Sequence, residues 1–180
     1  MLTFGKTGLE GCLELQPSIK DDCRGRFVKI FMYSHYSAQG LATDFKEEYY
    51  SVSEQGVVRG VHFQRPPHAH TKLVYCCEGT VLDVIVDLRK SSPTFKQAVT
   101  VNLSAEQGNM IYIPQGFGHG FCVLSKTATL LYKVTSEYAQ EFDDGILWSS
   151  IPIDWPINTP RISERDAGFS SLCEFESPFD

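Results

Sequence analysis

The sequence contains no apolar run of the roughly 18–20 residues that a membrane-spanning helix needs. Its opening letters, MLTFGKTGLEGCLEL, lack the charged and then apolar pattern of a secretory signal peptide, so we expect a cytoplasmic protein. The formal net charge is −6, and no basic stripe runs along the chain. General nucleic-acid binding is therefore disfavoured, because that function needs clustered positive charge.

No pair among the six cysteines has the CxxC spacing of a zinc site or a redox motif. Cys76 and Cys77 are adjacent on a predicted strand, which places their side chains on opposite faces. A chain of 180 residues can also bury a core without a disulfide framework. The sequence thus predicts reduced and mostly buried thiols.

A sustained helical period is missing as well, and short apolar segments bounded by turn residues take its place. Val99, Val101 and Leu103 alternate with Thr100 and Asn102, which is the period of a strand with one buried face. Serial short strands of this kind are typical of a closed sandwich or barrel. The predicted strands are Phe27–Tyr33, Glu47–Ser53, Val57–Phe63, Lys72–Glu78, Thr80–Leu88, Ala98–Ser104, Asn109–Ile113, Gly118–Leu124 and Ala128–Ser136.

Turns, helices and the chain end complete the predicted architecture, a single all-β domain over residues 1–180. The stretch from Cys77 to Thr80 predicts a tight hairpin turn between two strong strands. Short helices are predicted at Leu41–Phe45 and Ser163–Ala167. Residues 174–180 are polar and contain a proline, which predicts a loose tail.

One stretch, RGVHFQRPPHAHTKLVY (residues 59–75), holds three of the five histidines. His68 and His70, together with His119 in a PxGxxH setting, are similar to the metal ligands of cupin-type barrels. Pro66 and Pro67 favour a loop before the pair, however, and the expected carboxylate is missing after it. A metal site is therefore the less favoured interpretation.

His62 in the same stretch suits proton chemistry. Regular strand alternation puts Gly60 and His62 on one face and Arg59 on the other, unless a bulge intervenes. A histidine can act as a base near neutral pH when a partner fixes its tautomer. Asp166 is a candidate partner, and Tyr132 on another predicted strand is a candidate proton donor.

Several sequence blocks, taken in order, resemble the dTDP-4-dehydrorhamnose 3,5-epimerase family. The resemblance runs from Asp22 to about Ala167 and implies a cupin-type jelly roll. It also implies a homodimer that exchanges a segment near residues 22–50, and catalysis without a metal or other cofactor. The blocks are RGVHFQRPPHAHTKLVYCCEGTVLDVIVDLRKSSPTF, IPQGFGHGFCVLS, LLYKVTSEYA, DGILW, IDWP and SERDA.

The resemblance implies epimerisation of a nucleotide-linked 4-keto-6-deoxyhexose at C3, C5 or both, through an enolate. His62 would be the base, Asp166 its partner, and Tyr132 the acid on the opposite face of the sugar. Lys72 would lie near the developing oxyanion.

Further residues would bind the substrate. Arg59 suits the diphosphate because its planar guanidinium offers several donors. His119 would contact the substrate, Tyr138 would stack on the base, and Arg24 would reach the nucleotide across the dimer interface.

The chain departs from the family pattern around the expected nucleotide base. Lost amide and acceptor groups would leave thymine hydrogen bonds unpaired. A CDP- or GDP-linked sugar therefore stays open beside the dTDP-linked default. The changed positions are Lys29 for Glu, Glu47-Glu48-Tyr49 for a Gln-x-Asn element, His70-Thr71 for Gln-Gly, Asp143 for Glu, Trp148-Ser149-Ser150 for Trp-Asn-Asp, and Arg165 for Lys.

Three alternatives remain at this point. A 3,4-ketoisomerase on the same fold would move a proton along one face of the sugar. A metal-dependent cupin enzyme would use His68, His70 and His119, and a sugar-binding cupin would have no catalytic role. The presence of both His62 and Tyr132 favours epimerisation, because two opposite faces need two groups.

Overall fold

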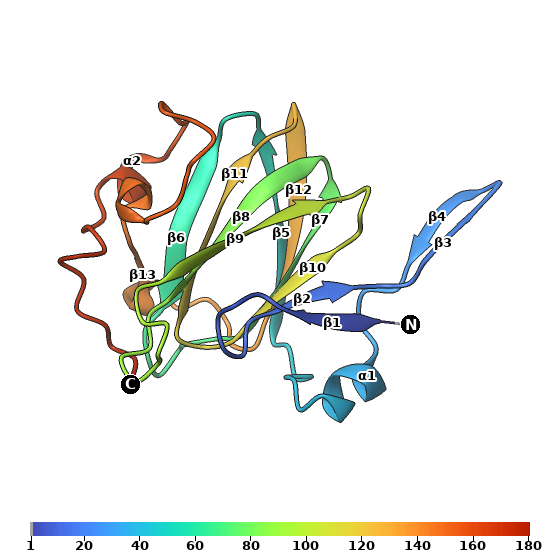
Figure 1. Ribbon diagram of the computed structural model, residues 1–180, viewed down its shortest axis with the longest axis horizontal. Coiled ribbons are helices and arrows are strands. Elements are labelled where there is room, and N and C mark those ends of the chain that lie inside the picture. Colours follow the sequence, from blue (N-terminus) through green and yellow to red (C-terminus); the bar gives the residue numbers. More distant parts are fainter. Residues whose placement is uncertain (1) are drawn as a thin grey trace.

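A computed structural model describes residues 2–180 and shows two facing antiparallel sheets (Figure 1). One sheet has six strands in the order β1-β2-β10-β7-β12-β5, and the other has five in the order β13-β6-β11-β8-β9. The first sheet comprises β1 (Thr3–Lys6), β2 (Leu13–Gln16), β10 (Met110–Ile113), β7 (Lys72–Glu78), β12 (Thr127–Val134) and β5 (Glu47–Glu54). The second comprises β13 (Asp143–Gly145), β6 (Val58–Gln64), β11 (Phe117–Val123), β8 (Thr80–Asp87) and β9 (Ala98–Ser104). The all-β prediction is confirmed.

The main core fills the space between the sheets. Along β12 every second residue is buried, and Leu130 and Tyr132 point inward because side chains alternate across a strand. Leu130 packs in one cluster with Ile111 of its own sheet and with Ile85 and Phe121 of the facing sheet. Each such fully buried side chain contributes about 1.5–3 kcal/mol.

A second apolar cluster covers the outer face of the five-stranded sheet. Val61 and Val84 pack there against Ile146, Leu172 and Phe179 from the C-terminal segment. Strand β8 is therefore buried on both faces, which explains its nearly continuous apolar sequence.

The last residues belong to this cluster and do not form the predicted loose tail. Phe179 is only 7% exposed, and Ser177 donates a hydrogen bond to the carbonyl of Leu88. The prediction was wrong because it weighed the polar composition of residues 174–180 and not the two phenylalanines within them.

The helices are short, and one of the two predictions is confirmed. Helix α2 (Glu164–Ala167) begins after Ser163, whose hydroxyl accepts a bond from the Asp166 amide at 3.1 Å. Helix α1 (Tyr33–Ala38) lies at the end of a segment predicted as strand, and its fully buried Tyr36 anchors it. The predicted helix at Leu41–Phe45 is wrong, since that segment is irregular.

The predicted tight turn at Gly79 exists, but the strands that it joins do not pair with each other. β7 pairs with β10 and β12, whereas β8 pairs with β11 and β9 in the other sheet. Gly79 has a φ of +78°, and a Cβ there would lie 2.0 Å from the Thr127 carbonyl oxygen. The turn therefore carries the chain from one sheet to the other, and the hairpin prediction was wrong because both edges of β7 are already paired.

A bulge in β6 changes which side chains share a face. His62 lies opposite His119 and Arg59 lies opposite Phe121, so two residues of β6 face Gly120 alone. These two residues are Gly60, with a φ of +113°, and Val61, which packs in the outer apolar cluster. Because a bulge reverses the alternation beyond it, Arg59 and His62 lie on the same face.

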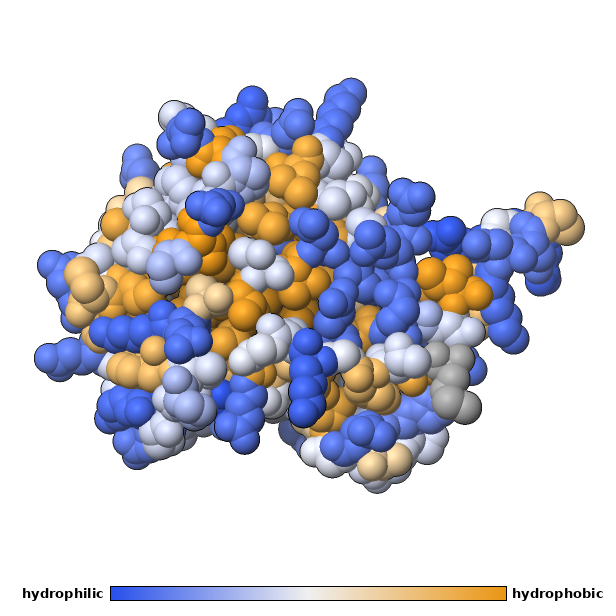
Figure 2. All heavy atoms as spheres, in the orientation of Figure 1, coloured by the Kyte–Doolittle hydropathy of each residue, from blue (hydrophilic) through white to orange (hydrophobic). Residues whose placement is uncertain are grey.

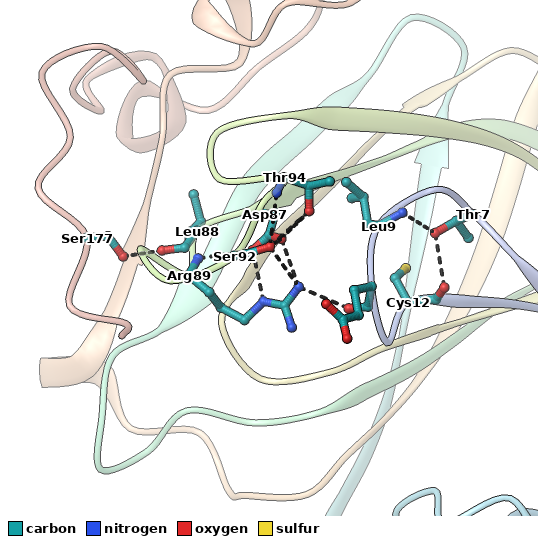
Figure 3. Close-up of polar contacts among 10 residues, drawn as sticks. Thr7, Leu9, Cys12, Asp87, Leu88, Arg89, Ser92, Thr94 and Ser177 are labelled. Atoms are coloured by element: carbon teal, nitrogen blue, oxygen red, sulfur yellow. Dashed lines mark hydrogen bonds and ion pairs between the residues drawn. The ribbon is translucent and has the colours of Figure 1, made fainter.

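A buried carboxylate ties the loop after β8 to the turn between β1 and β2 (Figure 3). Asp87 is fully buried and accepts bonds from Arg89 at 2.8 and 2.9 Å, from Ser92 at 2.5 Å and from Thr94 at 2.7 Å. Arg89 in turn donates to the Glu10 carbonyl at 3.0 Å. Burial opposes ionisation of Asp87, but these bonds hold its pKa below the usual value.

Strands β3 (Ile19–Asp22) and β4 (Gly25–Val28) form a separate two-stranded arm that projects from the sandwich (Figure 1). Arg24 lies at its tip and pairs with Asp22 at 2.6 Å, with 85% of its own side chain exposed. Phe27 is also exposed on the arm. Figure 2 shows a hydrophilic arm with apolar surface at its root.

All six cysteines are free thiols in the described part of the chain. Cys76 is buried and its neighbour Cys77 exposed, as their opposite orientation predicted. Only half of the six are buried, so the expectation of mostly buried thiols was too strong. Within residues 2–180, no helix is long and apolar enough to cross a membrane.

Candidate active site

A cavity of about 400 Å³ opens between the two sheets. His62 enters it from β6 of the five-stranded sheet, and Tyr132 enters it from β12 of the six-stranded sheet. Arg59, His119 and Lys72 line the same cavity. The arrangement therefore places a potential base and a potential acid on opposite walls.

His62 is held by Asp166, a residue more than a hundred positions later in the chain. The Nε2 of His62 lies 2.9 Å from Asp166 Oδ1, and Asp166 Oδ2 accepts a bond from the Gly60 amide at 3.0 Å. Burial opposes ionisation of Asp166, yet the bonds from His62, Gly60 and Ser163 hold its pKa below the usual value. A carboxylate in this position keeps the proton of neutral His62 on Nε2 and leaves Nδ1 free to accept one.

Tyr132 is almost completely buried and stays protonated. Its ring stacks on Tyr49 with centroids 4.7 Å apart and an interplanar angle of 15°, and its hydroxyl lies 3.5 Å from Ser51 Oγ. Burial raises the pKa of Tyr132 far above its usual value. The phenol is thus available as a proton donor across the whole neutral range.

Lys72 supplies positive charge inside the cavity. The residue is 7% exposed, and its Nζ donates to the His62 carbonyl at 3.3 Å. Burial lowers the pKa of Lys72 to about 8, although Asp143 and Asp83 oppose that shift. The side chain is therefore still mainly a cation at neutral pH.

His119 has its own buried carboxylate, which the sequence analysis missed. The Nε2 of His119 lies 2.8 Å from Asp83 Oδ2, and both side chains are almost inaccessible to solvent. Burial raises the pKa of Asp83, while His119 and Lys72 oppose the rise. The available signal was an acidic residue in the middle of the largely apolar strand TVLDVIVD, which also ends in one, Asp87.

Five of the predicted binding residues lie at the cavity or its rim. Tyr138 donates its hydroxyl to Asp143 Oδ2 at 3.2 Å, and Arg165 pairs with the same oxygen at 2.7 Å. The Tyr138 amide donates to Glu47 Oε2 at 2.7 Å. Arg59 binds Ser53 Oγ through its Nε at 3.0 Å and is otherwise exposed.

Two predicted residues do not reach this cavity within one chain. Arg24 lies at the tip of the arm, and Lys29 lines a smaller cavity of about 180 Å³ at the arm's root, together with Lys20 and His35.

The three histidines of the metal alternative do not come together. His70 and His119 line the cavity, but His68 packs against Phe142 with ring centroids 4.5 Å apart. Among residues 2–180, no three His, Cys, Asp or Glu side chains are grouped as metal ligands. The geometry therefore gives this alternative no support.

Residues 6–174 match the family model described as dTDP-4-dehydrorhamnose 3,5-epimerase. The chain belongs to this family. The predicted resemblance is thereby confirmed, as are the cupin-type jelly roll and the class of enzyme, an epimerase.

Individual members of the dTDP-4-dehydrorhamnose 3,5-epimerase family align over nearly the whole chain. The dTDP-4-dehydrorhamnose 3,5-epimerase of Shigella flexneri is 45% identical, over 89% of this chain and 91% of its own. A dTDP-4-dehydrorhamnose 3-epimerase of Streptomyces niveus is 37% identical, over 93% and 82%. The crystal structure of a dTDP-6-deoxy-D-glucose-3,5-epimerase from Legionella pneumophila, in complex with dTDP-4-keto-L-rhamnose, has a TM-score of 0.93 and 36% identity, over 98% and 95%.

Proposed function

We propose that this chain epimerises a nucleotide-diphosphate-linked 4-keto-6-deoxyhexose at C3, C5 or both, in deoxysugar biosynthesis. The observation that carries the proposal is the placement of His62 and Tyr132 on opposite walls of one cavity. A carbon centre inverts when a proton leaves one face and another proton arrives on the opposite face. A 3,4-ketoisomerase would not need the second group.

The proposed reaction begins at His62. Its free Nδ1 takes a proton from the carbon next to the C4 ketone, and the electron pair of the broken C–H bond moves to the ketone oxygen as an enolate. Asp166 stabilises the imidazolium, and Lys72 stabilises the enolate oxygen. Tyr132 then protonates the opposite face. Afterwards His62 releases its extra proton to solvent, and the Tyr132 phenolate takes one up from solvent.

The remaining predicted residues are proposed to hold the substrate. Arg59 binds the diphosphate, and His119 binds the sugar. The rim residues Tyr138, Asp143 and Arg165 lie where the nucleotide would leave the cavity. Glu47 and Tyr49 line the cavity between these two regions and are proposed to contact the nucleotide.

We further propose a homodimer that exchanges part of the segment near residues 22–50: the arm and Lys29 serve the partner's site, whereas Glu47 and Tyr49 stay at their own chain's cavity. Arg24 at the tip of the arm and Lys29 at its root do not line their own chain's large cavity, and the arm projects from the sandwich (Figure 1). A second copy is the simplest source of a cavity for them. Because sugar nucleotides are made in the cytoplasm, we propose that location as well.

A dTDP-linked sugar is the favoured substrate, since the Shigella flexneri and Streptomyces niveus relatives are named for dTDP-linked sugars and align over nearly the whole chain. Lys29 and Tyr49 are the reasons to test other bases. A lysine at the first position removes an acceptor, and a phenol at the second replaces an amide.

The test uses dTDP-, CDP- and GDP-linked 4-keto-6-deoxyhexoses in deuterated water. We expect deuterium to enter at C3, C5 or both, and only the dTDP sugar to turn over efficiently. Preferential turnover of another nucleotide would change the substrate assignment. Absence of exchange with all three, or a product with its ketone moved to C3, would refute the proposed function.

A further inference from the structure

His70 borders the cavity on the loop before β7, next to Lys72 and His119. Its Nδ1 lies 3.1 Å from Gln64 Nε2 and 3.2 Å from Ser136 Oγ. Its Nε2 is buried and has no hydrogen-bond partner within residues 2–180. None of the roles proposed above uses this side chain.

The orientation of Gln64 indicates which ring nitrogen carries the proton. Gln64 Oε1 accepts a bond from the Ala139 amide at 2.6 Å, and Gln64 Nε2 donates to the His68 carbonyl at 2.9 Å. The amide therefore turns its NH₂ group, which can only donate, toward His70. We therefore infer that Nδ1 of His70 accepts from this group and that the ring proton sits on Nε2.

The imidazole is also neutral. Burial lowers the pKa of His70 to about 3, and the nearby charges of Lys72 and His119 act in the same direction. An N–H group that is buried without an acceptor is costly to leave unpaired. Because the ring borders the cavity, a bound ligand is the group that can bring an acceptor to it.

We propose that His70 donates its Nε2–H to the C4 oxygen of the sugar, beside Lys72, and strengthens this bond as the oxygen becomes an enolate. The inference rests on the proposed epimerase function and adds one residue to it. A neutral imidazole supplies a second donor without adding a second cation next to Lys72, which would be repelled. The site is thus specific for a keto sugar through two different donors, one charged and one neutral.

Three variants test the proposal in the full-length protein. His70→Leu removes the donor, and we expect kcat for C3 or C5 exchange to fall about 10²–10³-fold with little change in KM. His70→Gln keeps an amide donor and should recover most of that loss. His68→Leu is the matched control, because His68 belongs to the same His-Ala-His stretch but packs against Phe142. The kcat of this variant should remain near that of the wild type.

The tautomer provides a readout that a merely structural histidine would not move. In a ¹⁵N NMR spectrum, the free protein should show His70 with its proton on Nε2, and saturation with the dTDP-linked keto sugar should shift that nitrogen. A proton on Nδ1, or wild-type kcat in a folded His70→Leu variant, would overturn the proposal. If wild-type protein exchanges no sugar, the proposed function fails and this inference fails with it; exchange that is indifferent to His70 refutes this inference alone.

Discussion

His62 and Tyr132 face each other across one cavity, each carried by a different sheet of the sandwich. The two steps of an inversion would therefore depend on different residues: His62 removes a proton from one face of the sugar, and Tyr132 adds one to the other face. Substitution of Tyr132 should therefore leave proton removal by His62 intact, whereas substitution of His62 stops both steps.

Tyr132→Phe should separate the two steps. The variant still removes the substrate proton through His62, so deuterium from the solvent should enter without inversion, while epimer formation falls about 10²–10⁴-fold. His62→Ala should lose exchange and inversion together. Mass spectrometry of the recovered sugar measures the first quantity and NMR the second. Equal loss of exchange in both variants would contradict the assignment of base and acid.

Asp166→Asn tests the carboxylate that holds His62. An amide NH₂ facing Nε2 would push the histidine proton onto Nδ1, the nitrogen that must accept, so kcat should fall about 10²–10⁴-fold. Glu164→Gln, on the exposed side of α2, is the control and should have no such effect. Full activity in Asp166→Asn would show that the tautomer of His62 does not matter.

Lys72→Met should make the protein more stable and less active. Burial lowers the pKa of Lys72 from 10.5 to about 8, so the charged side chain costs about 1–3 kcal/mol in the folded state at pH 7. The unfolded chain binds more protons between these two pH values, so wild-type stability should gain in this window as pH rises, and the variant should lack that gain. Chemical denaturation at pH 7 and pH 10 measures the free energy of unfolding of the wild type and of the variant. Wild-type activity should decline above pH 8, as the cation is lost.

Gly60→Ala should damage the fold at the site itself. A Cβ at Gly60 would lie 2.6 Å from the Gly120 Cα, and we expect a loss of about 3 kcal/mol or more. Gly25→Ala is the matched control, because Gly25 has the same φ of +113° but nothing within 4 Å of the added carbon. Its loss should be about 1–2 kcal/mol. Similar losses in the two variants would mean that the close approach of β6 and β11 is unimportant.

The exchange of arms between subunits predicts complementation. Arg24→Ala and His62→Ala should each be nearly inactive, but a refolded mixture should recover activity, because a heterodimer contains one site with both native residues. With random pairing the recovery approaches about a quarter of wild type. Size-exclusion chromatography checks the dimer, and absence of recovery in a mixed dimer would place Arg24 in its own chain's site.

Strands with a clear alternation or a continuous apolar run could be predicted from the sequence, and mostly exposed strands could not. β12 and β9 show the period of two and were predicted within a residue or two. β3 and β4 were missed or merged with the next segment, because their residues are mostly exposed and no buried face marks them. Their pairing on the arm depends on the turn between them and not on a core.

The site follows the same division. His62, Lys72 and Tyr132 could be found because they stand in distinctive motifs, and the structure brings them to one cavity. The shared orientation of Arg59 and His62 could not be predicted, because the bulge depends on the register with β11, a strand far along the chain. Asp83 was missed for a related reason. It meets His119 only because β8 pairs with β11, and this pairing cannot be predicted from the sequence.

The C-terminal segment covers the apolar outer face of the five-stranded sheet and also carries Asp166. All strands of the sandwich are complete by Gly145, so the barrel can close before its base receives a carboxylate. If this segment detached from the sheet, apolar surface would be exposed and His62 would lose its hydrogen bond to Asp166 at the same time. Catalytic activity in this chain therefore reports that the last part of the fold is in place.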